Sequence, residues 1–181
     1  MLTAGAWASE MVGPLLQDLA VPERQVLIWL AIRRPELFTL ERFPVFNVLV
    51  PEGRFYGFPE FGVPGFKFGK YHHLAEQVDP EAVARVANAQ DEATLRVFAE
   101  RYFPDGAGET LDTQVCMFTN SPDEHFIVDV HPEYRQVSIA AGFSGHGFKF
   151  CSVIGEIMAD LALNGQTRHD IGLFRLSRFS T

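Results

Sequence analysis

The sequence predicts an α+β fold, in which a mixed or antiparallel sheet occupies the middle of the chain and helices flank it. Three observations support this class. Short runs rich in Val, Ile and aromatic residues, punctuated by Gly and Pro, fill residues 23–71. Three more strand candidates lie within residues 112–141, and helical patterns cover residues 4–19 and 148–163. Because strands follow one another without alternating helices, the order is not the βαβ series of a parallel sheet.

The first half of the chain begins with a predicted helix over residues 4–19, in which Pro14 makes the second half uncertain. The run ERQVLIWLAI, residues 23–32, predicts a strand. Residues 43–50 and 55–58 predict a hairpin with Gly53 in its turn. Residues 66–71 predict the next strand.

In the second half, Asp79 followed by Pro80 predicts the start of a helix, with Asp as the N-cap. Residues 91–102 predict a further helix. Strands are expected at residues 112–119, 124–130 and 136–141. The last helix, residues 148–163, is expected to end at Asn164 and Gly165.

Composition and charge exclude several classes of protein. The 181 residues are 47% hydrophobic and 21% charged, which is enough to bury a core. A net charge of −8 without a basic run argues against a nucleic-acid partner. No apolar run is long enough to cross a membrane, and the start lacks the basic segment of a secretory signal, so we expect a cytoplasmic protein. The two cysteines, Cys116 and Cys151, have no metal-like spacing, and we expect no disulfide between them.

The stretch AAGFSGHGFKF, residues 140–150, joins a predicted strand to a predicted helix. Its glycines allow positive φ and close backbone approach, and the first N–H groups of a helix favour a negative partner. Lys149 in the first helical turn opposes the helix dipole, which suggests an external anion. Equally, the glycines can shape a tight turn that leaves Lys149 solvated. The residues alone leave both alternatives open.

Four segments carry a resemblance to a known family. They are LTAGAW (residues 2–7), FYGFPEFG (55–62), CMFTNSPDEHFIVDVHPE (116–133) and GFSGHGFKF (142–150). In this order they resemble the C-terminal region of the monomeric sarcosine oxidase and N-methyltryptophan oxidase family. The resemblance implies an FAD-dependent oxidase that acts on secondary amines of amino acids, uses oxygen and releases hydrogen peroxide. The chain end, with SVIGEIMADLA and FRLSRF, is closer to the N-methyltryptophan branch.

The same resemblance implies a domain organisation. Residues 1–20 and 135–181 would be remnants of a glutathione-reductase-like FAD-binding domain, and residues 21–134 would form the substrate domain. The sequence contains no G-x-G-x-x-G fingerprint, so the N-terminal βαβ unit of such a domain is missing. We therefore expect a truncated oxidase that is inactive alone. Its partners would be the missing half, or other copies of itself.

The resemblance also implies the residues that bind the cofactor. Cys116 matches the cysteine that carries FAD through a thioether. Lys149 matches a lysine beside the flavin ring that activates oxygen. A fixed cation there would stabilise the negative charge that oxygen acquires on reduction. The backbone of the glycine turn would face the flavin through four residues: Gly145, His146, Gly147 and Phe148.

The substrate side of the site is implied by three positions. His72 matches a histidine near the substrate amine, although His73 stands beside it and one insertion blurs the match. Tyr56 matches a tyrosine of the substrate pocket. Phe118 departs from the tyrosine of the sarcosine oxidases, so the identity of the amine stays open. We expect no metal: His125 and Asp129 can share one strand face, but the family matches this segment without one.

Two functions remain at the level of sequence, and the residues leave open whether the chain is itself an enzyme. The first is the C-terminal part of an FAD-dependent oxidase of N-methyl or other secondary amino acids. The second is a non-catalytic remnant, or a small-carboxylate-binding module without flavin. The missing fingerprint favours the second for the chain alone, because much of the affinity for a dinucleotide comes from its pyrophosphate site.

Overall fold

The structure is a computed structural model that describes residues 1–179. The chain forms two compact units: unit 1 comprises residues 1–23 together with the chain from residue 117 onward, and unit 2 comprises residues 24–116. The chain enters unit 2 within strand β1 (Val21–Leu30) and leaves it within strand β5 (Thr110–Asn120). Boundaries predicted from sequence stood at residues 20/21 and 134/135, so the region from 117 to 134 is grouped differently here.

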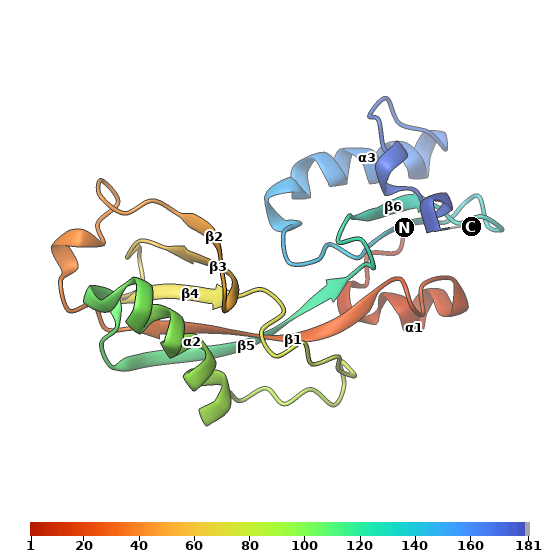
Figure 1. Cartoon of the computed structure of the whole chain (residues 1–181). Helices are drawn as coiled ribbons and strands as arrows, with labels where there is room; N and C mark the ends of the chain where they lie inside the picture. The colour runs from red at the N-terminus through yellow and green to blue at the C-terminus, as the bar shows by residue number, and fades with distance from the viewer. Residues whose placement is uncertain (180–181) are drawn as a thin grey trace. The chain divides into compact units, whose positions relative to one another are not determined.

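Unit 2 is built on a five-stranded sheet in the order β2-β3-β4-β1-β5. Its other strands are β2 (Phe46–Val50), β3 (Gly53–Phe58) and β4 (Phe66–Lys70). Helix α2 (Ala89–Tyr102) covers one face of the sheet (Figure 1). Buried aromatic rings fill the space between helix and sheet, and Phe55 and Phe98 stack with centroids 3.9 Å apart. This packing leaves the other face of the sheet for side chains that do not belong to the core.

The strand register places the non-core side chains in two rows. In one row, Lys67 of β4 pairs with both Phe58 of β3 and Trp29 of β1. In the next row, Gly69 pairs with both Tyr56 and Leu27. Alternation along a strand puts these residues on the face opposite the buried phenylalanines. Rows two residues apart lie about 6.6 Å from each other along the strand.

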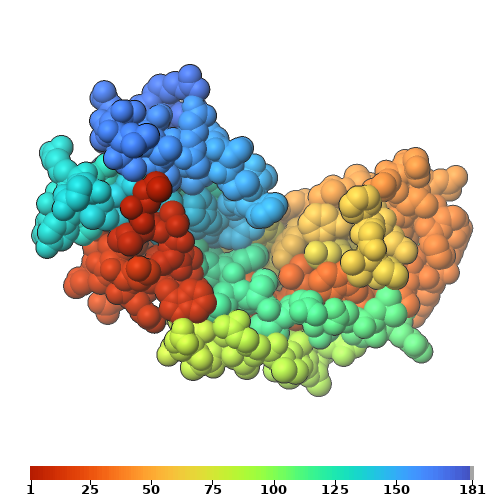
Figure 2. Space-filling model, turned by 180° about the vertical axis from the view of Figure 1, so that it is seen from behind, coloured from red at the N-terminus to blue at the C-terminus, as the bar shows by residue number. Residues whose placement is uncertain are grey.

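Unit 1 contains the antiparallel pair β6 (Ile127–Val130) and β7 (Ser138–Ala141). A parallel bridge joins Leu2 to Ile139 on β7. Helix α3 (Cys151–Asn164) packs on this pair through Ile157, Met158 and Leu161. The short helix α1 (Ala8–Val12) and the C-terminal segment around Leu176 both pack on the β6–β7 pair. The space-filling view shows the red N-terminal segment beside the blue C-terminal one (Figure 2).

Most predicted elements are confirmed, within a few residues at their ends. They are the hairpin around Gly53, the strands near residues 23–32, 66–71, 112–119 and 136–141, and the helices near 91–102 and 148–163. Helix α3 ends at Gly165, whose φ of 68° is the left-handed C-cap expected from the sequence. The strand expected at 124–130 begins only at Ile127, because Ser121 and Asp123 hold the preceding residues in a turn. Among residues 1–179, no helix has the length and apolar character needed to cross a bilayer.

The first predicted helix is broken. Only Ala8–Val12 is α-helical, with short 3-10 turns on either side. The break falls at Gly13, where φ is 70°, immediately before Pro14. Glycine permits this backbone conformation, and proline removes the N–H that a continuing helix would use.

The helix predicted to start at Asp79 is wrong. Asp79 accepts the backbone N–H of Glu81 at 2.8 Å, as an N-cap would, but the turn ends after Ala82. The following carbonyl oxygens are bonded elsewhere: the Arg24 side chain donates to the carbonyls of Ala84 at 2.9 Å and Val86 at 3.2 Å. A side chain far away in sequence thus supplies the partners that a helix would otherwise provide.

Candidate functional site

Tyr56 lies flat over β4 on the non-core face of unit 2. A Cβ atom at Gly69 would stand 2.8 Å from the Tyr56 Oη, so the ring needs a glycine beneath it. Burial raises the pKa of Tyr56 well above its ordinary value, and nearby Cys116 and Tyr71 raise it further. The phenol therefore stays protonated at neutral pH and keeps its hydroxyl as a hydrogen-bond donor.

Cys116, near the end of β5, is a half-buried free thiol. Burial raises its pKa, and the positive charge of Lys67 opposes that rise. Lys67 also lies over two rings of its own row, with its Nζ 4.8 Å from the Trp29 centroid and 5.5 Å from the Phe58 centroid. The structure thus brings the predicted residues Tyr56 and Cys116 together with a lysine that the sequence analysis missed. The signal was present in FKFGK, where alternation sets Lys67 opposite Phe66 and Phe68.

The adjacent histidines have different environments. His73 is 1% exposed, and its Nε2 lies 2.9 Å from the Asp91 carboxylate. Burial lowers the pKa of His73, against the opposing effect of Asp91. His72 is half-buried in the turn after β4, with a left-handed φ of 52°. His73 is thus committed to a buried network, and of the two histidines only His72 has a partly exposed side chain.

The glycine turn of unit 1 is packed against phenylalanine rings of the chain itself. A Cβ at Gly145, where φ is 75°, would lie 2.3 Å from the Phe118 ring, and one at Gly147 would lie 2.6 Å from Phe143. Ser144 fixes the turn to the end of β5, because its N–H donates to the Thr119 carbonyl at 3.0 Å. Both glycines therefore have a packing role. Of the two, only Gly145 has the positive φ expected from the sequence, since φ of Gly147 is −79°.

We expect Gly145→Ala to destabilise the protein by about 1–3 kcal/mol, because the methyl group clashes with Phe118 and the backbone has positive φ. The matched control is Gly155→Ala inside α3, where nothing lies within 4 Å of the new Cβ. That change should stabilise by about 0.5–1 kcal/mol through helix propensity. Urea denaturation of both variants measures the difference, and an equal effect at the two positions would contradict the packing role of Gly145.

Lys149 lies in a 3-10 turn, Phe148–Phe150, that precedes α3, whose N-cap is Phe150. The sequence predicted Lys149 in the first turn of this helix, but α3 begins only at Cys151, so Lys149 lies in the turn before the α-helix. Its side chain is exposed, with Nζ 5.3 Å from the Phe150 centroid, and neighbouring Phe148 is 92% exposed. The backbone N–H of His146 donates to the Phe143 carbonyl, while its Nε2 lies 3.0 Å from the Glu124 carbonyl oxygen.

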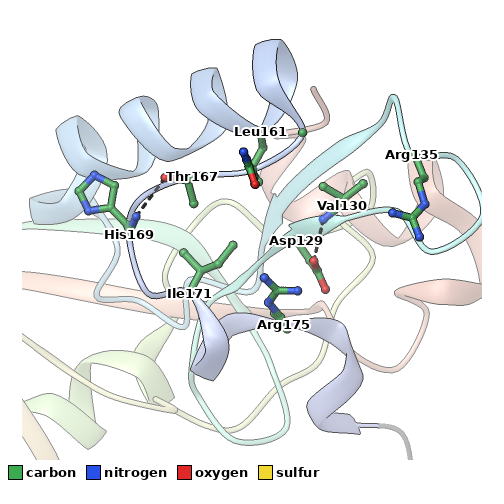
Figure 3. Close-up of a pocket in the computed structure, with 10 residues that line it drawn as sticks. Asp129, Val130, Arg135, Leu161, Thr167, His169, Ile171 and Arg175 are labelled. Carbon is green, nitrogen blue, oxygen red and sulfur yellow. Dashed lines mark hydrogen bonds between the residues drawn. The ribbon is translucent and has the colours of Figure 1, made fainter.

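Unit 1 also has a cavity of about 390 Å³ between the end of α3 and β6 (Figure 3). Asp129, Arg135, His169 and Arg175 are among the residues that line it. Both Asp129 oxygens already accept backbone N–H groups, from Val130 at 2.8 Å and Leu176 at 2.9 Å. Over residues 1–179, no three His, Cys, Asp or Glu side chains are grouped closely enough to hold a metal.

Comparison with known proteins gives the family. The sequence pattern of the FAD dependent oxidoreductase family (DAO) matches residues 1–161. The chain belongs to this FAD-dependent oxidoreductase family. It is 45% identical to a monomeric sarcosine oxidase of Bacillus sp. (strain NS-129) over 98% of this chain and 46% of the relative. It is 37% identical to an N-methyl-L-tryptophan oxidase of Salmonella dublin over 99% of this chain and 47% of that protein.

The chain thus spans about half the length of the curated FAD-dependent oxidoreductases that it matches. Solved structures agree on the fold. A fructosamine oxidase of Aspergillus fumigatus (Amadoriase II) superposes with a TM-score of 0.74 at 20% identity, over 97% of this chain and 43% of that one. NikD, an amino acid oxidase of nikkomycin biosynthesis, gives 0.74 at 21% identity, over 96% and 47%.

The residues on the non-core face of unit 2 fit the family's cofactor. A half-buried free thiol, a protonated phenol and a cation lie on one face of the sheet, and the Tyr56 ring itself lies over Gly69. Cys116, Tyr56 and Lys67 are the residues of this face that would contact the cofactor.

Proposed function

We propose that this chain forms the substrate side of an FAD-dependent oxidase of N-methyl or other secondary amino acids, which converts amine and O2 to imine and H2O2. The observation that carries this proposal is the grouping of Cys116, Tyr56 and Lys67 on one face of the unit 2 sheet. The residues that bind the remainder of FAD would come from a complementary polypeptide segment, and the chain alone would show little turnover.

When bound, FAD supplies the redox chemistry, taking a hydride equivalent from the amine and passing two electrons to oxygen. The side chains of this chain bind and orient. Tyr56, kept protonated by burial, would donate a hydrogen bond to the substrate. His72 would hold the substrate carboxylate or tune its amine, because imidazole changes charge near neutral pH. Cys116 would fix the cofactor in register with them.

A cation is needed where negative charge develops on oxygen. Lys149 is the lysine that the family resemblance assigns to this role, and it lies exposed in unit 1. Lys67 is the second candidate, and the support for it is geometric: it lies on the same face as Cys116, close enough to influence the pKa of the thiol. The two lysines make the assignment testable one at a time.

We expect amine-dependent peroxide formation when the chain is produced with a complementary dinucleotide-binding segment and FAD. Replacing the oxygen-activating lysine by Met should lower the rate of reaction with oxygen about 100- to 1,000-fold, since one charged group aimed at developing charge is lost. Lys67→Met and Lys149→Met are compared under the same conditions, with stopped-flow measurement of reoxidation. If neither variant slows that step, neither Lys67 nor Lys149 has the role.

The alternative function, binding of a small carboxylate without flavin, is favoured by the cavity in unit 1, where Arg135 and Arg175 present two cations. The same preparation decides between the two. A chain that remains colourless with its complementary segment and binds acetate or succinate in an Arg175-dependent manner supports this alternative. A flavin-containing chain that produces peroxide supports the oxidase.

A further inference from the structure

Two turns of unit 1 contact each other after the end of β5. One is the glycine turn, residues 142–147, and the other is the segment 121–125 between β5 and β6, which we call the β5–β6 turn. Each turn contains a non-glycine residue with a left-handed backbone: Ser144, with a φ of 49°, and Glu124, with a φ of 60°. Such a conformation is strained in residues with a side chain, and it persists only where neighbouring groups hold it.

The two turns are hydrogen-bonded to each other at two points. The backbone N–H of Ser121 donates to the Oγ of Ser144 at 3.2 Å, and this Oγ donates to the Gly142 carbonyl at 3.1 Å. The Nε2 of His146 lies 3.0 Å from the Glu124 carbonyl oxygen, which can only accept, so Nε2 carries the hydrogen and donates it. The positions of Ser144 and His146 therefore depend on the position of the β5–β6 turn.

Arg178, in the C-terminal segment, binds the β5–β6 turn from its other side. Its Nε donates to Asp123 Oδ2 at 2.7 Å, and its Nη2 donates to Asp123 Oδ1 and to the His125 carbonyl, each at 3.0 Å. The Arg178 side chain is 13% exposed, and its guanidinium lies 4.0 Å from the centroid of the Phe179 ring. Two parallel hydrogen bonds fix the carboxylate in orientation as well as in distance, so Arg178 sets the geometry of this turn.

The ion pair is intact over a wide range of pH, and its base is rigid. Hydrogen bonds from Arg178 and then from the backbone N–H of His125 lower the pKa of Asp123 to about 2, so the carboxylate is charged at neutral pH. The segment that carries Arg178 is anchored two residues earlier, where Leu176 is buried in the core and donates its N–H to Asp129 at 2.9 Å. The C-terminal segment can therefore transmit a fixed position to the β5–β6 turn.

We propose that Arg178 and Asp123 are positioning residues for the glycine turn, which they hold in place through the contacts of Ser121 with Ser144 and of Glu124 with His146. We call the Arg178–Asp123 pair the C-terminal brace. Its effect on the cofactor rests on the proposed oxidase function, because only the family resemblance assigns the glycine turn to the flavin. The brace itself needs neither flavin nor turnover.

The first test is amide hydrogen exchange in the 181-residue chain, followed by NMR. Arg178→Met removes the charged group, and exchange at the Ser121 and Ser144 amides should become about tenfold faster because the turns open locally. The amides of the β6–β7 ladder and of α2 should keep their rates. Arg168→Met is the matched control, since Arg168 also pairs with a carboxylate, that of Glu156, but is 78% exposed. It should leave all of these rates unchanged.

The second test uses the chain produced with a complementary dinucleotide-binding segment and FAD. Arg178→Met should shift the visible absorption of the flavin, and Arg178→Lys, which keeps the charge without the two parallel bonds, should shift it less.

Unchanged exchange at Ser121 and Ser144, or an increase that the β6–β7 amides share, would overturn the inference, and so would a flavin spectrum that Arg178→Met leaves unaltered. If exchange responds as expected but the protein holds no flavin, the brace stands and the oxidase proposal fails. A flavin-containing protein whose exchange does not respond supports the oxidase and overturns the brace.

Discussion

Arg24→Met is expected to destabilise the protein by about 3–5 kcal/mol, a large part of the roughly 5–15 kcal/mol typical of a folded domain. Arg24 is 2% exposed and binds the Asp91 carboxylate through two hydrogen bonds of 2.8 Å. Methionine keeps much of the apolar stem but leaves Asp91, which is fully buried, without its cation. The same change frees the carbonyls of Ala84 and Val86, which Arg24 holds in place of a helix.

Urea denaturation measures this loss, with Arg34→Met as the control. Arg34 also pairs with a carboxylate, Glu36, but both side chains are more than half exposed, and such pairs add little stability. Circular dichroism at neutral pH verifies that each variant is folded before denaturation. An Arg24 variant no less stable than the Arg34 variant would show that the buried pair does not hold unit 2 together.

The same network predicts how stability depends on pH. Hydrogen bonds from Arg24, and then from the Asn88 backbone and His73, hold the pKa of Asp91 well below its ordinary value. As pH falls, Asp91 binds a proton in the unfolded chain at a higher pH than in the folded protein. This stabilisation is therefore complete above about pH 4 and is lost as pH falls towards the pKa of Asp91 in the folded state. Burial also lowers the pKa of His73. The stability that neutral His73 contributes is therefore present above about pH 6.5 and is lost as pH falls below that value. In the Arg24→Met protein, the part of the stability loss at low pH that comes from Asp91 should be smaller.

When the chain is produced with a complementary dinucleotide-binding segment and FAD, which we call the completed protein, Cys116→Ser is expected to abolish retention of flavin by the denatured polypeptide. Cys116 would supply the sulfur of a thioether to a methyl carbon of the ring, with the loss of two protons and with oxygen as the acceptor of the two electrons. Serine is close in size but cannot form that bond. Because the Cys116 thiol is half-buried and its pKa is raised, we expect the attachment to be slow at neutral pH and faster as pH rises.

The measurement is the yellow colour of acid-precipitated protein, compared with that of the folded protein before precipitation. The Cys116→Ser protein should carry flavin while folded and release it on denaturation. Cys151→Ser is the matched control, since Cys151 is an exposed free thiol at the start of α3. Colour that survives denaturation of the Cys116→Ser protein would place the attachment elsewhere.

Local signals in the sequence were sufficient for much of the fold. Gly53 indicated the hairpin, Gly165 indicated the end of α3, and alternation indicated the strands, because each depends on backbone preferences within a few residues. The helix at Asp79 failed because its carbonyls are bonded by Arg24, about 60 residues away in sequence. No local pattern reports such a partner, and only packing decides between a helix and an extended segment there.

In the candidate site, too, local motifs indicated some residues, and only contacts between distant segments indicate the others. Tyr56 and Cys116 were predicted as site residues from their motifs, and the structure places both on one face of the sheet. Lys67 was missed because its position on this face depends on its pairing with Phe58 and Trp29 on two neighbouring strands. That pairing is set by the strand register, which no local pattern gives.

The most direct test of the account is a peptide map of the completed, flavin-containing protein after alkylation of its free thiols. We predict that the peptide with Cys116 carries the mass and fluorescence of the flavin, while Cys151 is fully alkylated. Alkylation of both cysteines in a protein that holds flavin and oxidises amines would contradict the claim that the Tyr56, Lys67 and Cys116 face of unit 2 receives the flavin through a bond to Cys116.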